Sequence, residues 1–103
     1  MQRTPDLFDL SGKTALITGA GGLLGPKHAE ALIECGARVV LTDHHLDRVV
    51  KREAELNSKY DKRVATSHRM DVTNKGNVEE VFSRYDSIDI DLKAKEKSNL
   101  LNS

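Results

Sequence analysis

The 103-residue sequence contains a single cysteine, Cys35, which excludes a disulfide within the chain and favours a reducing, cytoplasmic compartment. It has no long apolar run, so we expect no membrane-spanning helix. The first ten residues lack the apolar core of a signal peptide. An excess of charge is also missing, because 16 basic residues balance 16 acidic ones. We therefore expect neither nucleic acid nor a membrane surface as a partner.

The length limits the chain to one small domain, and a hydrophobic content of 38% with 31% charged residues is typical of a globular protein. A chain this short is small for a complete α/β enzyme, so we expect a truncated domain. The structured part is predicted over residues 1–92, and the polar residues 93–103 are predicted to form a C-terminal tail.

Apolar runs and helical periodicity alternate along the chain. Strands are predicted at Thr14–Thr18, Arg38–Thr42, Val64–Met70 and around Ile88–Leu92. Helices are predicted at Leu23–Cys35, Leu46–Leu56 and Val78–Tyr85. This alternation predicts an α/β protein with helices on both faces of a parallel sheet. We expect a partial Rossmann fold in three layers, with about four strands in the order 3-2-1-4.

A glycine-rich turn joins the first strand to the first helix, in the segment Thr18-Gly-Ala-Gly-Gly-Leu-Leu-Gly25. Gly19 would permit the tight turn out of the strand, and Gly22 would leave room for a pyrophosphate. Gly25 would let the helix pack closely on the sheet, and the free N–H groups at the helix start would face the phosphates. The P-loop of nucleotide triphosphatases is excluded, because Lys and Ser/Thr do not directly follow the last glycine.

Asp43 ends the second predicted strand, roughly 20 residues beyond the glycines, which is the interval typical of a ribose-binding acid. Its carboxylate would accept hydrogen bonds from the adenosine ribose and would repel a 2′-phosphate. NAD is therefore predicted as the cofactor rather than NADP. The alternative is that Asp43 caps the following helix or lies in a solvated turn.

The chain resembles the short-chain dehydrogenase/reductase family. The likeness begins with Leu-Ser-Gly-Lys-Thr-Ala-Leu-Ile-Thr-Gly at residues 10–19, and it includes Met-Asp-Val-Thr at residues 70–73. The resemblance implies that Asp71 and Val72 hold adenine, and that Leu23 and Leu24 offer backbone N–H groups to the pyrophosphate. The alternative for Asp71 is that it caps the third helix together with Thr73.

The glycine spacing, Thr-Gly-x-x-Gly-x-x-Gly, is similar to the extended branch of the family, whereas the opening segment is more similar to the shorter branch. The subfamily therefore stays open at this point.

The family's catalytic motif is missing. The resemblance leads us to expect Asn-Ala-Gly after the fourth strand and then a catalytic Ser and Tyr-x-x-x-Lys, in which Tyr exchanges the proton and Lys lowers its pKa. The only tyrosines are Tyr60 and Tyr85, and neither is followed by lysine four residues later. Tyr85 is interpreted as the last apolar contact of the third helix. No histidine has the spacing of a metal ligand.

We therefore expect the NAD(H)-binding portion of an oxidoreductase without catalytic residues. The alternative is a non-catalytic or regulatory NAD-binding module that pairs with another chain. The alternating pattern of the fourth strand suggests a half-exposed edge, so a homo-oligomer or a complementary chain is a possible partner. A third interpretation is a functionless product of a truncated reading frame.

Overall fold

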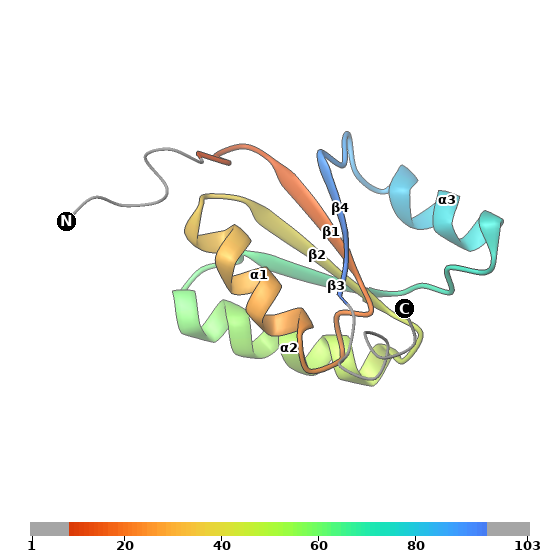
Figure 1. Cartoon of the computed structure of the whole chain (residues 1–103), viewed down its shortest axis with the longest axis horizontal. Helices are drawn as coiled ribbons and strands as arrows, with labels where there is room; N and C mark the ends of the chain where they lie inside the picture. The colour runs from red at the N-terminus through yellow and green to blue at the C-terminus, as the bar shows by residue number, and fades with distance from the viewer. Residues whose placement is uncertain (1–8, 95–103) are drawn as a thin grey trace, which may run out of the picture.

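The computed structural model describes residues 9–94, which form a four-stranded parallel sheet between two layers of helices (Figure 1). The elements follow in strict alternation along the chain. They are β1 (Thr14–Thr18), α1 (Gly25–Glu34), β2 (Arg38–Asp43), α2 (Leu46–Tyr60), β3 (Ala65–Arg69), α3 (Lys75–Ser83) and β4 (Ile90–Lys93). The sheet order is β3-β2-β1-β4, and all three strand pairs are parallel. The predicted fold class and strand order are confirmed.

The face of the sheet that packs against α1 and α2 holds the larger core. Odd-numbered residues of β1 and β2, such as Ile17 and Leu41, are fully buried there. Ile33 from α1 and Val49 from α2 pack against them. The β-branched and apolar runs of the two central strands therefore explain why this layer is fully buried.

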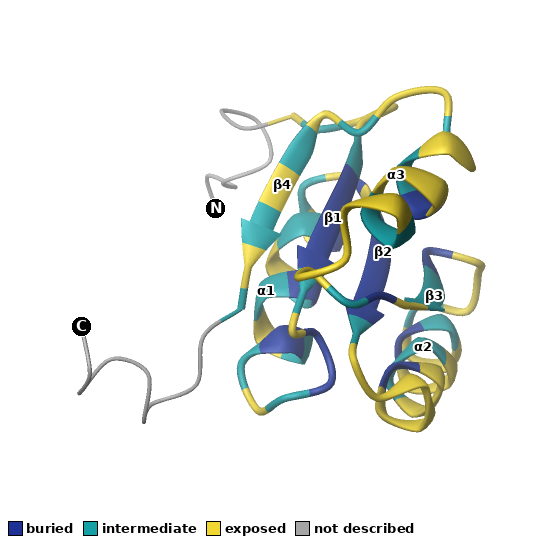
Figure 2. Ribbon diagram, turned by 90° about the vertical axis from the view of Figure 1, so that its right-hand side faces the viewer, coloured by how far each residue is buried: buried dark blue, intermediate teal, exposed yellow. Residues whose placement is uncertain are grey.

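Among the described residues, α3 is the only helix on the opposite face, as Figure 2 shows. Leu16 and Val40 point to this side and pack against Val81 of the helix. In β4 the register pairs Asp91 with Leu16, so this carboxylate lies on the same face. Asp91 is exposed, whereas Ile90 and Leu92 pack against the larger core. β4 is thus an edge strand with one apolar and one polar face.

Side chains and backbone from distant parts of the chain fix the strand ends. Thr14 donates its N–H to Oδ2 of Asp89, at 2.9 Å, and Asp89 donates its own N–H to the Thr14 carbonyl, at 2.8 Å. Asn57 of α2 accepts the N–H groups of Val64 and Ala65 at the start of β3. These bonds set the register of both outer strands at their amino-terminal ends.

Some predicted boundaries need correction. The first helix begins at Gly25 rather than Leu23, because the glycine turn continues to its N-cap, Leu24. The third helix ends at Ser83, so Tyr85 lies beyond it, although its ring still packs against the smaller core. β4 runs from Ile90 to Lys93, whereas the fourth strand was predicted around Ile88–Leu92. The rest of the predicted tail, from residue 95, lies outside the described residues.

Among the described residues, none of the three helices has the length and apolar character needed to cross a bilayer.

Candidate dinucleotide site at the carboxyl ends of the strands

A cleft of about 640 Å³ opens where the four parallel strands end. Its walls come from the last residues of β1, β2 and β4 and from the segments that follow β1, β2, β3 and β4. From β1 the chain moves to β2 and then β3 on one side of β1. It then crosses to the other side of β1, where it forms β4. This reversal of strand order is where open α/β sheets bind their ligands. The topology therefore places the candidate site at this edge.

The glycine turn leaves β1 through a residue with a left-handed backbone. Gly19 has φ of +67°, and a Cβ built on it would lie 2.9 Å from the Ala94 carbonyl oxygen. The turn is closed by the Gly22 N–H, which donates to the Gly19 carbonyl at 3.2 Å. Gly19 itself lines the cleft. Only glycine satisfies both the backbone angle and the space at this position.

The start of α1 packs directly on the glycine turn. Gly25 is buried, and a Cβ there would lie 2.2 Å from the Ala20 carbonyl oxygen. Gly25 was predicted to permit close packing of the helix on the sheet, whereas its closest approach is to the glycine turn at Ala20. The N-cap, Leu24, makes no side-chain capping bond, and Leu23 before it is 76% exposed. The N–H groups of the first turn therefore have no side-chain acceptor at the cap.

Asp43 connects the end of β2 to the glycine turn. Its Oδ2 accepts the N–H of Gly21 at 2.9 Å, and its Oδ1 accepts the N–H of His45 at 2.9 Å. Each carboxylate oxygen has two acceptor positions, so both oxygens keep capacity for a ligand. The alternative that Asp43 caps the following helix is wrong. The N-cap of α2 is His45, which makes no side-chain capping hydrogen bond.

Gly21 is a site residue that the sequence reasoning missed. It is buried, and a Cβ there would lie 2.5 Å from Cβ of Arg48 and 2.9 Å from Oδ2 of Asp43. Any side chain at this position would push the turn away from the carboxylate. The signal in the sequence was the pair of consecutive glycines, of which only Gly22 was assigned a role.

Asp71 and Val72 form the wall of the cleft beyond β3. Oδ1 of Asp71 accepts the backbone N–H of Thr73 at 2.9 Å and its hydroxyl at 2.6 Å. These two bonds, together with nearby His44 and Arg69, hold the pKa of Asp71 below its usual value despite some desolvation. Val72 is 62% exposed, so an apolar surface is available on this wall.

The capping alternative for Asp71 and Thr73 is wrong. The N-cap of α3 is Asn74, whose Oδ1 accepts the N–H of Asn77 at 3.0 Å. The Asp71 bonds form a separate turn just before the helix. The Asp71 N–H in turn donates to Oδ1 of Asn77 at 2.7 Å, so the helix start and the cleft wall are tied together.

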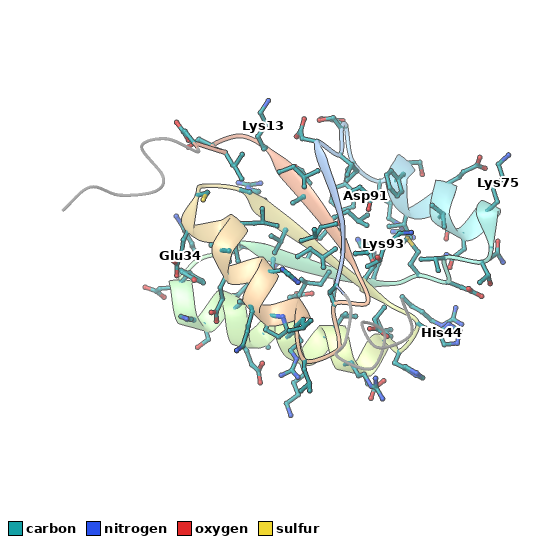
Figure 3. All side chains as sticks on the ribbon, viewed as in Figure 1. Lys13, Glu34, His44, Lys75, Asp91 and Lys93 are labelled. Atoms are coloured by element: carbon teal, nitrogen blue, oxygen red, sulfur yellow. The ribbon has the colours of Figure 1, made fainter. Side chains whose placement is uncertain are left out.

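Lys93 is a second residue that the sequence reasoning did not place in the site. It ends β4, pairs in register with Thr18, and lines the cleft next to Ala94, whose N–H donates to the Thr18 carbonyl at 2.9 Å. Figure 3 shows it on β4, with His44 at the end of β2. Lys93 brings a positive charge to a cleft that also holds Asp43 and Asp71. Its position in the polar C-terminal stretch hid this role.

The cleft therefore brings together Gly19, Asp43, Asp71 and Val72 among the predicted site residues. Gly22, Leu23, Leu24 and Gly25 do not line it and instead form the turn and helix start that follow Gly19.

Neither tyrosine lies at the cleft. The Tyr60 hydroxyl donates to Oε2 of Glu34 at 2.9 Å. Partial desolvation, and then the hydrogen bond to the Glu34 carboxylate and its negative charge, raise the pKa of Tyr60 to about 12. The Tyr85 hydroxyl bonds to Oγ1 of Thr66 and to Nε2 of His68 on the outer strand β3. Within residues 9–94, no three His, Cys, Asp or Glu side chains cluster as metal ligands would.

Comparisons with known proteins agree with this geometry. The family model described as short chain dehydrogenase matches residues 13–90. A sorbitol dehydrogenase of Cereibacter sphaeroides is 36% identical over 85 residues, which are 79% of this chain and 31% of that protein.

Solved structures give the same result. A short-chain type dehydrogenase/reductase from Mycobacterium marinum superposes with a TM-score of 0.70 at 37% identity, covering 81% of this chain and 33% of that one. The 3-ketoacyl-(acyl-carrier-protein) reductase from Brucella melitensis, complexed with NADH, superposes with a TM-score of 0.67 at 29% identity. The match covers 81% of this chain and 34% of that one. The chain thus spans about a third of the length of the proteins it matches.

Proposed function

This chain belongs to the short chain dehydrogenase family, and from that premise we propose that it binds NAD(H) in the cleft at the carboxyl ends of its strands. It would be the dinucleotide-binding portion of an oxidoreductase, without the Ser-Tyr-Lys residues that perform catalysis in the family. A nicotinamide dinucleotide is the cofactor with which family members of this fold have been solved, as in the NADH complex of the Brucella reductase.

The carboxylate of Asp43 is the observation that carries this proposal. Two backbone N–H groups hold it at the end of β2, one from the glycine turn and one from His45. A carboxylate held in this way is preorganised to accept the two hydroxyls of an adenosine ribose. The same negative charge disfavours the 2′-phosphate of NADP, so NAD is the proposed cofactor.

The residues around Asp43 suit the other parts of a dinucleotide. The start of α1, without a side-chain cap, offers a positive dipole end to the pyrophosphate together with the backbone N–H groups of Leu23 and Leu24. Gly22 leaves room beside it, because it has no side chain. The turn at Asp71 and the exposed side chain of Val72 provide a polar and an apolar contact for adenine. When bound, the nicotinamide ring supplies hydride transfer, which is the cofactor's chemistry.

The described residues place neither tyrosine hydroxyl beside that chemistry. Both tyrosine hydroxyls are engaged away from the cleft, Tyr60 by Glu34 and Tyr85 by Thr66 and His68. We therefore expect binding of NADH without turnover of an alcohol or sugar by this chain alone.

A fluorescence titration with NADH tests the proposal. Asp43→Ala removes the ribose acceptor and Gly22→Val fills the space beside the pyrophosphate. Because a hydrogen bond to a charged group contributes about 1.5–3 kcal/mol, Asp43→Ala should weaken NADH binding at least tenfold, which corresponds to ~1.4 kcal/mol. NADPH should bind the unmutated chain more weakly than NADH.

Asp47→Ala is the matched control, because Asp47 is an exposed acid in the first turn of α2 and does not line the cleft. Its NADH affinity should equal that of the unmutated chain. If Asp43→Ala and Gly22→Val leave NADH fluorescence unchanged while circular dichroism shows a folded protein, the proposal is wrong.

The open edge of β4 favours one second candidate, a binding module that pairs with another chain. In the described part of the chain β4 hydrogen-bonds only to β1, which leaves its other edge free for a further strand. Sedimentation velocity over a wide concentration range tests this for self-pairing, and a purely monomeric profile at high concentration counts against a homo-oligomer.

A further inference from the structure

A second hollow, of about 230 Å³, lies at the amino-terminal ends of β1, β2 and β3, on the edge of the sheet opposite the dinucleotide cleft. We call it the amino-edge pocket. Val40, Val64 and Ala65 are buried side chains that line it, and Arg38, Arg63 and Tyr85 contribute its larger polar groups. It therefore combines an apolar base with a few polar groups, the pattern of a small-molecule site.

Neighbouring chain segments carry the two arginines of this pocket, both of which are exposed. Arg38 is the first residue of β2, and Arg63 lies just before β3. The N–H of Val39 donates to the Val64 carbonyl at 2.9 Å, so the strand entries that carry both arginines are adjacent. Two permanent positive charges on neighbouring strand entries favour an anion at the pocket that both residues line.

The described residues supply no such anion. Neither Arg38 nor Arg63 has a carboxylate of residues 9–94 within ion-pair distance. Two acids of the same edge have other partners, since Asp89 accepts the Thr14 N–H and Glu34 accepts the Tyr60 hydroxyl. The charge of the two guanidiniums is therefore available to a ligand.

The aromatic wall of the pocket is fixed in place. The Tyr85 hydroxyl lies 2.9 Å from Oγ1 of Thr66, and it also bonds to Nε2 of His68. With its hydroxyl held by β3, the ring lines the pocket in one orientation and presents a flat apolar surface to a ligand. A rigid wall lowers the entropic cost of binding.

We propose that the amino-edge pocket binds a small carboxylate with an apolar body, such as an aromatic acid. The guanidiniums of Arg38 and Arg63 bind the carboxylate, for which their planar donors are suited. The apolar base and the Tyr85 ring receive the body of the ligand. The volume is smaller than the ~300–1,000 Å³ of sites for drug-sized ligands, which limits the body to about one ring. This site is separate from the dinucleotide cleft and does not depend on it.

The test is an NMR titration of the ¹⁵N-labelled full chain with benzoate. We expect saturable shifts at the amides of Val40, Ala65 and Thr66, with a Kd on the order of 1 mM for a ligand of this size. Arg38→Gln and Arg63→Gln should each weaken benzoate binding at least about fivefold. Arg38→Lys, which keeps the charge but loses the planar fork, should weaken it less than Arg38→Gln.

Lys62→Gln is the matched control, because Lys62 lines a neighbouring hollow with both arginines but not the amino-edge pocket. It should leave the Kd for benzoate unchanged, and the spectrum without ligand shows whether each variant is folded. Benzyl alcohol and inorganic phosphate separate the two parts of the proposal. The proposal is overturned if benzyl alcohol binds as tightly as benzoate, if phosphate does so, or if Lys62→Gln weakens binding as much as the arginine variants.

Discussion

The two faces of the sheet differ in how fully the described residues cover them. On one face α1 and α2 bury alternate residues of the central strands, and even Ile90 of the edge strand β4 packs against that core. On the other face α3, a helix of nine residues, forms a smaller core around Leu16 and Val40. There Asp91 of β4 remains exposed beside Leu16.

This difference shows which parts of the fold hold the candidate site in place. The glycine turn packs on the start of α1, and Asp43 is tied to that turn, so this half of the cleft rests on the well-covered face. The Asp71 wall is attached to α3 through Asn77 and rests on the less covered face. We therefore expect the side of the cleft that is formed by the glycine turn and Asp43 to be more rigid than the side formed by Asp71.

The largest expected effect comes from equal truncations on the two faces. Leu41 and Leu16 are both fully buried in adjacent central strands, but Leu41 points to the α1–α2 face and Leu16 to the α3 face. Leu41→Ala should lower the free energy of unfolding by ~3–5 kcal/mol, and Leu16→Ala by only ~2–3 kcal/mol, because α3 can move into the cavity. Urea denaturation measures both, and equal losses would contradict the comparison.

A pair of glycine substitutions tests the same contrast at the two helix starts. Gly25→Ala should cost about 1–3 kcal/mol and weaken NADH binding, since its new Cβ would overlap the Ala20 carbonyl. Gly76→Ala, in the first turn of α3, meets only Asn74 Oδ1 at 3.5 Å and should stabilise the protein by up to ~0.5–1 kcal/mol. A destabilised Gly76→Ala variant would show that α3 is packed more tightly than its contacts indicate.

Replacing the exposed acid on the α3 face should extend that face's apolar surface. Asp91→Leu places an apolar side chain next to Leu16, and we expect a gain in stability below ~1 kcal/mol together with concentration-dependent association. Sedimentation velocity measures the association. Glu79→Leu, at an exposed position of α3, is the control and should remain less associated.

The smallest expected effect is a pH dependence that arises on the α3 face. Partial burial, and secondarily the positive charge of Arg84, lower the pKa of His68. The unfolded chain therefore binds a proton at a higher pH than the folded chain does. Stability should be complete above the usual histidine pKa of about 6.5 and should fall as the pH decreases through the window below it.

Thermal unfolding of His68→Gln between pH 5 and 8 measures this contribution. The variant should show a weaker loss of stability at the acidic end than the unmutated chain does. His28→Gln should keep the full dependence, and a His68→Gln profile identical to that of the unmutated chain would rule out the assignment.

The order of helices and strands could be predicted from the sequence because two local patterns agreed with each other. The apolar runs of β1 and β2 are typical of buried parallel strands, and the glycines between β1 and α1 mark a turn that few other folds require. Asp43 could be placed in the site because a strand end followed by a helix fixes its position. Gly25 could be predicted as a packing residue for the same reason.

The residues that were missed depend on contacts between distant segments. Gly21 is required because Arg48 and Asp43 approach it, and neither contact is visible from glycine spacing. Lys93 belongs to the cleft because β4 returns to pair with β1, whereas in the sequence it opens a polar stretch. Asn74 is the N-cap of α3, whereas Asp71 bonds to Thr73 instead. Both Asp and Asn are common N-cap residues, so the local sequence alone does not distinguish them.

The reciprocal hydrogen bonds between Thr14 and Asp89 have a consequence for the order of folding. They join residues 75 positions apart, so β1 gains its second neighbour only after most of the described chain has been synthesised. The unit of β1, α1 and β2 can form much earlier, with the glycine turn and Asp43 already in place. Because contacts between distant residues form slowly, docking of β4 should be the late step that limits the folding rate. Until it occurs, the edge of β1 is exposed to other strands, so aggregation should be most frequent before β4 docks.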